Sequence, residues 1–316
     1  LGDVYKRQMP DVLGTAQAIA LEQGARLVNC EFMQIMPGLV APVSNVVFNE
    51  KTFRFARIEG FGGAQGLLDA RSEHGPFTAS RPDREVDFAI DAAGDGGARV
   101  TYDLPEELPE FMKTFSDWLL EAHGIRPGDE LRVAHYAHAH NGGIIIGADA
   151  AVLGVPGLYA CGECTGGMHG ADRIGGLASA NALVFGRIAG REAAGFQGKK
   201  GVSATRLDAV ASPLASQTIA ELKPLMSRHC MVARTEGGLA QAQEMISELK
   251  RRLEHGAEPS VDAQAIAATR RAELSLLSAR ALICAMRART ESRGSHHRAD
   301  FPGKDPTQAR PTSIFL

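Results

Sequence analysis

The chain has 316 residues, of which 44% are hydrophobic and 22% charged, and its net charge is −3. This composition allows a sizeable core and argues against general disorder, while the charge argues against binding nucleic acid through bulk positive charge. No apolar run approaches the roughly 20 residues that span a bilayer, and the polar start is unlike a signal peptide. Five scattered cysteines fit a reducing compartment, so we expect a cytoplasmic protein of two domains or one large one.

The N-terminal residues divide into three segments. Residues 1–8, "LGDVYKRQ", resemble the translated end of a transposase adapter used in sequencing libraries. We therefore exclude them from the fold and expect the chain to begin inside a gene. Residues 11–24 predict a short helix that ends at a C-cap glycine, Gly24. Residues 25–38 predict a strand that enters a turn at Pro37-Gly38.

The middle of the chain combines one helix with short strands. The helix is predicted at residues 105–123, because Pro105 or Pro109 lies near its start and Gly124 follows its end. Alternating or continuous apolar residues then predict three strands, at 131–137, 142–147 and 157–162.

The second half is predicted to be mainly helical. A helix at residues 175–190 is rich in small residues, which permit close packing on a sheet or a cofactor. Two helices after residue 205 each have one apolar stripe at three- and four-residue spacing, which predicts core packing. The tail from Pro302 is expected to be loose. The stripes are Leu239, Ala242, Ile246, Leu249 and Leu253, and then Leu274, Leu277, Ala281 and Cys284.

Residues 162–176, "GECTGGMHGADRIGG", form a glycine-rich stretch whose only strong cation is Arg173. Glycine lacks a Cβ, so such a loop can approach a ligand closely. The helix that starts near Gly176 would present free N–H groups and a positive dipole end to an anion or an electron-rich ring. Glu163 could accept hydrogen bonds from sugar hydroxyls. The alternative is a tight turn that only joins a strand to a helix.

Two residue patterns raise the possibility of a metal site. Cys161 and Cys164 form a C-x-x-C pair, but no second pair or thioredoxin-like context accompanies it, so two small buried residues are the favoured interpretation. His135, His138 and His140 are close in sequence. On a strand, His138 and His140 would share one face and His135 the other, and no nearby ligand completes a site. We therefore predict no bound metal.

Three stretches together resemble one known family. They are "LGTAQAIALEQGARLVNCEFMQIMPG", "VPGLYACGECTGGMHGADRIGGLASANALVFGRIAG" and "ESRGSHHRADFP", at residues 13–38, 155–190 and 291–302. Each is similar to a segment of the fumarate reductase/succinate dehydrogenase flavoprotein family, which includes L-aspartate oxidase, and they occur in the family's order.

The resemblance implies an α/β plus α fold. It predicts a partial FAD-binding, Rossmann-type domain with an inserted α+β capping domain and a C-terminal helical domain. The FAD-binding domain would comprise residues 9–44 and 135–200, with the capping domain at 45–134 between them. The helical domain would be residues 201–301, and residues 302–316 a flexible tail.

The resemblance also implies which residues bind FAD. Glu163 would bind the ribityl or ribose hydroxyls, beside Gly162. Ala178 and Ser179 would lie against the isoalloxazine ring at the start of their helix, after Gly175 and Gly176. There the helix dipole would favour negative charge on the reduced ring. His169 would contact the flavin or orient Arg173.

For the substrate, the resemblance implies that Arg173 makes a bidentate pair with a carboxylate. His138, four residues before the Gly-Gly pair, would bind a carboxylate as well. His140 would replace it if the strand has a bulge, and the alternative is an ordinary surface or core histidine. Arg81 or Arg84, in "SRPDREVDFAI", would move the proton, although neither matches the family's Arg-Asp-x-x-Ser-x-Ala-Ile pattern without a shift.

Two further departures from the family pattern limit the prediction. No G-x-G-x-x-G follows a strand, since "GFGGAQG" at residues 60–66 has the wrong spacing. We therefore expect that the N-terminal Rossmann half is missing, and that the chain alone binds FAD poorly and is inactive. The family's His-Pro-Thr is Met36-Pro37-Gly38 here, so two hydrogen-bonding groups are lost and fumarate itself is in doubt.

The predicted function is hydride transfer between flavin N5 and a small dicarboxylate of the fumarate/succinate type. L-aspartate oxidase is the alternative within the family. An alternative of another class is a non-catalytic fragment, or a flavoprotein subunit that relays electrons to an iron–sulfur or other electron-transfer partner. The chain has no cysteine pattern for a cluster, so any cluster would lie on that partner.

Overall fold

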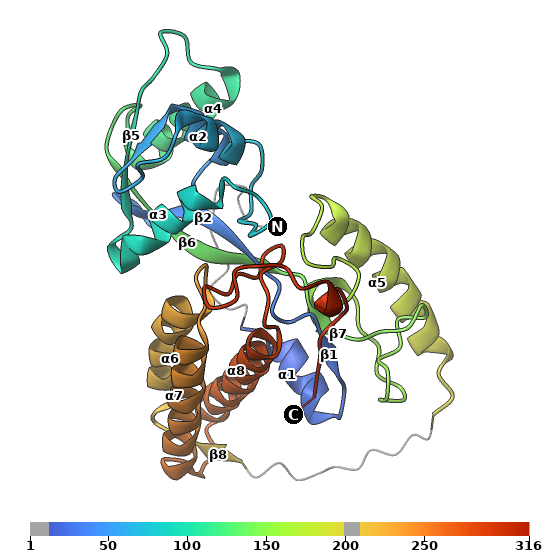
Figure 1. Cartoon of the computed structure of the whole chain (residues 1–316). Coiled ribbons are helices and arrows are strands. Elements are labelled where there is room, and N and C mark those ends of the chain that lie inside the picture. Colours follow the sequence, from blue (N-terminus) through green and yellow to red (C-terminus); the bar gives the residue numbers. More distant parts are fainter. Residues whose placement is uncertain (1–12, 199–208, 316) are drawn as a thin grey trace.

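Strands β2 (Met33–Ala41) and β6 (Leu131–His140) pair antiparallel and form the centre of a five-stranded sheet of order β3-β2-β6-β5-β4. This computed structural model describes residues 13–198 and 209–315. The sheet and the helices packed on it enclose an apolar core (Figure 1). We call this unit, residues 33–140, the capping region after the domain predicted at 45–134, although β2 and the end of β6 lie outside that range. Its other elements are β3 (Val46–Val47), η1 (Glu50–Phe55), β4 (Ala56–Ile58), α2 (Gln65–Arg71), α3 (Arg84–Ala92), η2 (Gly94–Gly96), β5 (Ala98–Tyr102) and α4 (Glu110–His123).

Strand β2 continues through Pro37 and Gly38, so the predicted turn at that position is wrong. Gly38 pairs with Val47 on one side and with Ala134 on the other. The Pro37 carbonyl also accepts a hydrogen bond from the Phe48 amide at 3.2 Å. Pairing with strands on both sides thus overrides the local preference of Pro-Gly for a turn.

The predicted helix at 105–123 is present as α4, which begins at Glu110. Pro109 is its N-cap, and Gly124 follows its last residue with φ +71°, a left-handed conformation that favours glycine. The helix predicted at 11–24 is α1 (Thr15–Glu22), and Gly24 has φ +87° after it. These helix ends follow from local sequence alone.

Three helices form a separate layer below the capping region (Figure 1). They are α6 (Ala215–Cys230), α7 (Glu236–His255) and α8 (Ala263–Ala288), and all five members of the first predicted stripe are buried in their common core. Thr235 caps α7 and Asp262 caps α8 through side-chain oxygens. Two short strands, β8 (Val210–Ala211) and β9 (Glu258–Pro259), pair beside them.

The central region contains a small sheet of order β10-β1-β7, made of β10 (Ser313–Ile314), β1 (Leu27–Val28) and β7 (Gly143–Ile144). Its pairings are antiparallel, so the Rossmann-type character of this region stays a prediction. Of the predicted strands, 142–147 is present only as β7. Residues 157–162 make an isolated bridge at Tyr159 and no strand.

The predicted loose tail is wrong for residues 302–315. β10 adds to the sheet, and the 3-10 helix η4 (Pro306–Gln308) is capped by Asp305. The buried Arg289 guanidinium donates to the carbonyls of Gln308 and Arg310 at 2.7 and 2.9 Å. A buried cation requires such acceptors, so it holds a segment that has few apolar residues of its own.

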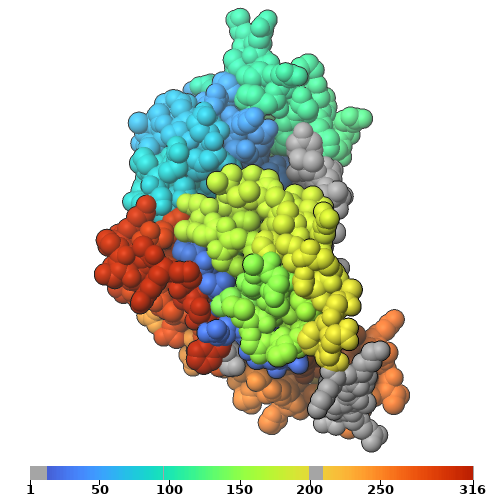
Figure 2. Space-filling model, turned by 90° about the vertical axis from the view of Figure 1, so that its right-hand side faces the viewer, coloured from blue at the N-terminus to red at the C-terminus, as the bar shows by residue number. Residues whose placement is uncertain are grey.

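Helix α5 (Leu177–Gly195) follows the 3-10 helix η3 (Gly162–Cys164), and only Asn181 of its 19 residues is buried. It lies along one face of the molecule (Figure 2). Among the described residues, no helix is both long and apolar enough to cross a membrane.

Candidate active site

Arg173 lies in the loop between η3 and α5, and Gln34 of β2 holds it there. Arg173 Nε donates to Gln34 Oε1 at 2.9 Å, and Gln34 Nε2 approaches the Arg173 carbonyl oxygen at 3.5 Å. Gln34 is only 3% exposed. No described residue accepts a hydrogen bond from the two terminal nitrogens of Arg173, so the forked end of the guanidinium is available to a ligand.

His138 occupies a β-bulge. Gln34 pairs with Ala139 and Ile35 with Ala137, which leaves His138 as the extra residue of β6. Bulges redirect a side chain, and the His138 ring is exposed. Partial desolvation, and then the charge of Arg173, lower the pKa of His138, while Glu163 raises it. Arg173, His138 and Glu163 therefore lie within electrostatic reach of one another.

The bulge also separates His138 from His140, so the expected shared face is wrong. His140 Nε2 hydrogen-bonds the Cys30 carbonyl at 3.1 Å, and its backbone amide donates to Glu163 Oε1 at 3.1 Å. His140 is thereby engaged within the protein although the strand has a bulge. His138 is the better placed of the two for a ligand.

Three glycines near the site are explained by backbone packing. A Cβ on Gly142 would lie 2.3 Å from the Asn29 carbonyl oxygen, and one on Gly143 would lie 2.3 Å from the Cys164 oxygen. A Cβ on Gly166 would lie 2.3 Å from the Gly143 nitrogen. Glycine is required at these positions because the main chains of three segments pack directly against one another, so no ligand is needed to explain it.

Gly175 and Gly176 are different. A Cβ on either would meet no described atom within 4 Å. Gly176 has φ +83°, which favours glycine, but Gly175 has no positive φ. Neither strain nor a neighbour within the described structure requires glycine at position 175, so its predicted part in FAD binding stays a prediction.

The first turn of α5 is the predicted position of the flavin ring. The N-cap is Gly176, and no side chain caps the helix, so its first amides are not used by a side chain. Ala178 is half-buried and Ser179 exposed. Four large apolar side chains nearby are also exposed, which is costly unless another body covers them. They are Ile174, Leu177, Leu183 and Val184, at 72, 42, 76 and 55%.

His169 and Glu163 complete this side of the site. Desolvation, and then the charge of Arg173, lower the pKa of His169, and Glu163 raises it. His169 Nδ1 is buried and has no hydrogen-bond partner in the described structure. Gly162, beside Glu163, has φ +74° and accepts a hydrogen bond from Asn181 of α5, so η3 is tied to that helix.

Arg81 and Arg84 are each engaged with partners other than Arg173. Arg81 Nε contacts Asp83 at 3.3 Å, and its side chain is 47% exposed. Arg84 Nη1 donates to the Ala79 carbonyl at 2.6 Å. Burial, and then the charge of Arg84, lower the pKa of His297 to about 4. Arg84 therefore faces the residues 291–302 motif, and neither arginine hydrogen-bonds Arg173 or His138 in the described structure.

The 291–302 motif joins the capping region to the Arg173 loop at Gly294. The Gly294 carbonyl accepts from the Ala79 amide at 2.7 Å, and its amide donates to Ser80 Oγ at 3.1 Å. Its φ is +53°, and a Cβ would lie 2.5 Å from the Ala171 carbonyl oxygen. Thr78 Oγ1 also donates to Asp172, next to Arg173, at 3.1 Å.

A buried ionic cluster in the capping region was not predicted from the sequence. Arg71 donates to both oxygens of Asp87 at 2.8 and 3.1 Å, and His135 Nε2 lies 2.9 Å from Asp87 Oδ1. Although burial raises it, the Arg71 charge and the His135 contact bring the pKa of Asp87 down to about 2. His135 is thus occupied within the fold.

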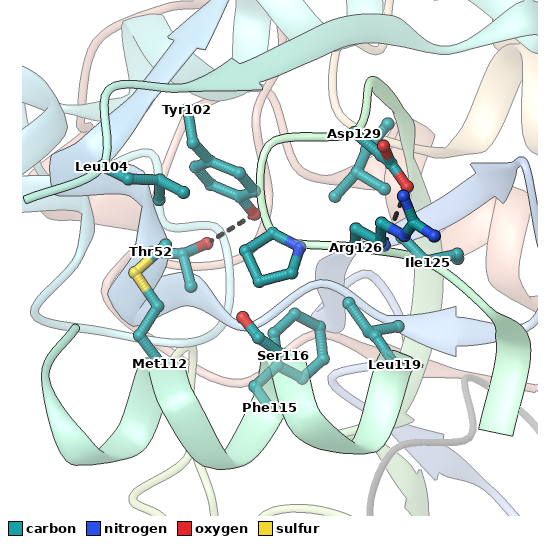
Figure 3. Close-up of a pocket in the computed structure, with 12 residues that line it drawn as sticks. Thr52, Tyr102, Leu104, Met112, Phe115, Ser116, Leu119, Ile125, Arg126 and Asp129 are labelled. Carbon is teal, nitrogen blue, oxygen red and sulfur yellow. Dashed lines mark hydrogen bonds between the residues drawn. The ribbon is translucent and has the colours of Figure 1, made fainter. Parts of the chain in front are cut away.

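The enclosed cavity of the capping region is not a substrate site. It lies among Thr52, Tyr102, Met112 and Phe115 and measures about 10 Å³, which is room for one water at most (Figure 3).

Cys164 Sγ donates to the Cys161 carbonyl at 3.2 Å, and burial raises the pKa of Cys164. Among the described residues, no three His, Cys, Asp or Glu side chains are arranged to hold a metal ion.

Two family models match the chain. The "FAD binding domain" matches residues 6–178, and the "Fumarate reductase flavoprotein C-term" matches residues 219–315. The chain belongs to the fumarate reductase/succinate dehydrogenase flavoprotein family. This flavoprotein family consists of FAD-dependent oxidoreductases, so the glycine-rich loop and α5 described above belong to a chain whose cofactor is FAD.

Curated relatives and a solved structure agree with this family. The L-aspartate oxidase of Caulobacter vibrioides is 29% identical over 95% of this flavoprotein chain and 55% of its own length. A fumarate reductase (CoM/CoB) chain from Methanothermobacter marburgensis is 30% identical over 96% and 59%, respectively. The Mycobacterium smegmatis Sdh1 complex in the apo form has a TM-score of 0.82 at 27% identity, covering 98% of this chain and 58% of that one. The chain therefore spans little more than half the length of these relatives.

Proposed function

We propose that this chain is part of an enzyme that interconverts the oxidised and reduced forms of a small dicarboxylate of the fumarate/succinate type. Bound FAD would supply the redox chemistry, which is exchange of a hydride between flavin N5 and a substrate carbon. The observation that supports this proposal is the position of Arg173. Its guanidinium is held by Gln34, its forked end is available, and His138 lies within its electrostatic reach.

Arg173 would bind one substrate carboxylate through its two terminal nitrogens, since a guanidinium matches a carboxylate bidentately. His138, whose pKa is lowered, would be neutral near pH 7 and would donate one hydrogen bond to the same carboxylate. Together they would orient the substrate carbon, and orientation alone can supply much of the rate. Glu163, Gly162, Gly175, Gly176, Ala178, Ser179 and His169 are the residues proposed to hold FAD.

The proton-transferring arginine is proposed to be Arg84 or Arg81. Arg84 is favoured because Arg81 is paired with the buried Asp83 and is half-exposed. Arg84 faces His297, which burial keeps neutral near pH 7.

Met36 and Gly38 would affect which dicarboxylate the site selects. Its terminal methyl group would lie 3.4 Å from a Cβ on Gly75, so an apolar side chain borders the residues 74–76 segment. Gly38 offers only its main chain, which is used in strand pairing. Selectivity among dicarboxylates should therefore differ from that of a protein with histidine and threonine at these positions.

L-aspartate oxidase activity is the second candidate, because enzymes of that name match 95 to 96% of this chain. Oxygen consumption upon addition of aspartate would distinguish it from fumarate reduction. An iron–sulfur or other electron-transfer partner is proposed for the fumarate/succinate reaction, and co-purification of an iron-containing subunit would support it.

The test of the proposed function is Arg173→Ala in the full-length, FAD-loaded enzyme of which this chain is part. Turnover should fall by at least about 100-fold while the flavin absorbance spectrum is unchanged, because the clamp is lost and the cofactor site is kept. Arg57→Ala is the control, since Arg57 is 73% exposed in the capping region. Retained turnover in Arg173→Ala would contradict the clamp. Absence of any substrate-dependent flavin reduction in the parent protein would favour a non-catalytic role.

A further inference from the structure

We infer that Gln34 is a positioning residue, which holds Arg173 so that both terminal guanidinium nitrogens face the substrate carboxylate. This inference rests on the proposed function, because it assigns Gln34 a part in the carboxylate clamp. Gln34 and Arg173 are 139 residues apart in the sequence and meet only in the folded protein.

Both polar atoms of the Gln34 side chain contact Arg173. The side chain is 3% exposed, and its carboxamide oxygen accepts from Arg173 Nε at 2.9 Å. The carboxamide nitrogen has one described contact, with the Arg173 carbonyl oxygen at 3.5 Å. A buried amide is costly unless it is hydrogen-bonded, so these contacts hold both the side chain and the main chain of Arg173.

Binding at Nε determines where the rest of the guanidinium points. The group is planar, so a fixed Nε–H fixes the plane and the direction of the two terminal nitrogens. Those nitrogens make no hydrogen bond to a described residue, and they are the pair that matches a carboxylate. Gln34 therefore restricts the rotation of Arg173 without competing for the ligand-binding end.

The neutrality of the carboxamide also matters. A carboxylate at the same position could accept the same hydrogen bond, but its negative charge would lie about 3 Å from Nε and would oppose a second carboxylate at the other end of the guanidinium. Glutamine gives the geometry without that charge. A test can therefore separate the hydrogen bond from the charge.

The position of Gln34 on β2 adds a further constraint. Gln34 pairs with Ala139, directly beside the bulge that contains His138. The two strands thus bring the support of Arg173 and the His138 ring to the same place in the sheet. The relative position of the two carboxylate-binding groups is therefore set by this strand pairing.

The test compares Gln34→Met, Gln34→Glu and, as the control, Gln217→Met, whose glutamine is exposed on α6. Two quantities are measured in the full-length, FAD-loaded enzyme. The first is the dissociation constant of succinate, and of malonate as a non-reacting dicarboxylate, by calorimetry. The second is the Arg173 Nε–H signal in ¹⁵N NMR, assigned with Arg173→Lys.

We expect Gln34→Met to weaken dicarboxylate binding about tenfold and to broaden or shift the Nε–H signal, because one hydrogen bond is lost. Gln34→Glu should keep a sharp Nε–H signal and yet weaken binding more than Gln34→Met at pH 8. Its binding should recover as the pH falls and the introduced carboxyl group becomes protonated. Gln217→Met should change neither quantity.

Unchanged affinity in Gln34→Met, with a sharp Nε–H signal, would overturn the inference. If Gln34→Met does not fold, Gln34→Ser replaces it, because its side chain is too short to reach Arg173 Nε, and unchanged affinity with a sharp Nε–H signal would overturn the inference equally. Affinity equal to the parent in Gln34→Glu at pH 8 would overturn only the argument from the neutrality of the carboxamide. The parent and Arg173→Ala distinguish the two proposals. If Arg173→Ala binds dicarboxylates as the parent does, the proposed clamp fails. If Arg173→Ala loses binding while Gln34→Met keeps it, only the role of Gln34 fails.

Discussion

Replacing Asp87 by Asn should destabilise the capping region by about 3 kcal/mol. Asp87 is fully buried between Arg71 and His135, and the Arg71 side chain is 0% exposed. Removing one member of a buried ion pair costs about 3–5 kcal/mol, because the other charge is left without its counter-ion. Arg71 keeps hydrogen bonds to the carbonyls of His74 and Gly75, at 2.5 and 3.0 Å, which places the cost at the lower end.

The pH dependence of the same pair gives a second magnitude. The pKa of Asp87 is lowered from 3.8 to about 2 in the folded protein. One pH unit corresponds to about 1.4 kcal/mol, so the charged form is favoured by roughly 2 kcal/mol on folding. Because the folded pKa lies below the unfolded one, this stability is present above pH 3.8 and is lost as the pH falls through about 2.

Urea unfolding followed by tryptophan fluorescence measures this effect. Trp118 is the only tryptophan, and it packs against the core of the capping region, so its signal reports on that region. Asp103→Asn is the matched control, since Asp103 and Arg57 form a pair that is 72 and 73% exposed, and such pairs contribute about 0–1 kcal/mol. A loss below about 1 kcal/mol in Asp87→Asn, or a difference from the parent that does not shrink between about pH 4 and pH 2, would refute this reasoning.

Two further predictions concern the junction between the capping region and the 291–302 motif. Gly294→Ala should cost about 3 kcal/mol, because its φ is +53° and a Cβ would lie 2.5 Å from a carbonyl oxygen. Gly60→Ala, with φ +83° and no atom within 4 Å, should cost only about 1 kcal/mol in the same urea assay, so equal losses would contradict the packing argument. Arg84→Gln should raise the pKa of His297 above about 4 in an NMR titration, yet leave it below 6.5 because burial persists. Arg81→Gln should leave the pKa of His297 unchanged. A shift in Arg81→Gln, with none in Arg84→Gln, would contradict the placement of Arg84 beside His297.

Local sequence was sufficient to predict α1, α4, α5 and α7, whereas α2 and α3 were not predicted. The apolar stripe of α7 is buried as predicted, and Gly24 and Gly124 adopt the left-handed conformation after their helices. The helix that follows the glycine-rich stretch was also located correctly, with Arg173 near the end of that stretch. These features depend on neighbours within a few residues, so periodicity and glycine placement are enough to predict them.

Other features depended on contacts between distant segments. Pro37-Gly38 lies within a strand because β3 and β6 pair with it on both sides, and the tail is ordered because Arg289 binds its carbonyls. The roles of individual glycines also depended on their neighbours. Gly142 is packed against the Asn29 main chain, whereas Gly175 faces open space.

Recurring motifs and local periodicity require only nearby residues, so the amino-acid sequence was enough to indicate the family and most of the long helices. The folded structure was needed to show that a bulge exposes His138 and that Gln34 binds Arg173. A buried glutamine in an apolar run, "FMQIM", indicates that some polar partner must exist. It cannot say which one, because that partner lies 139 residues away and is brought near only by the packing of the whole fold.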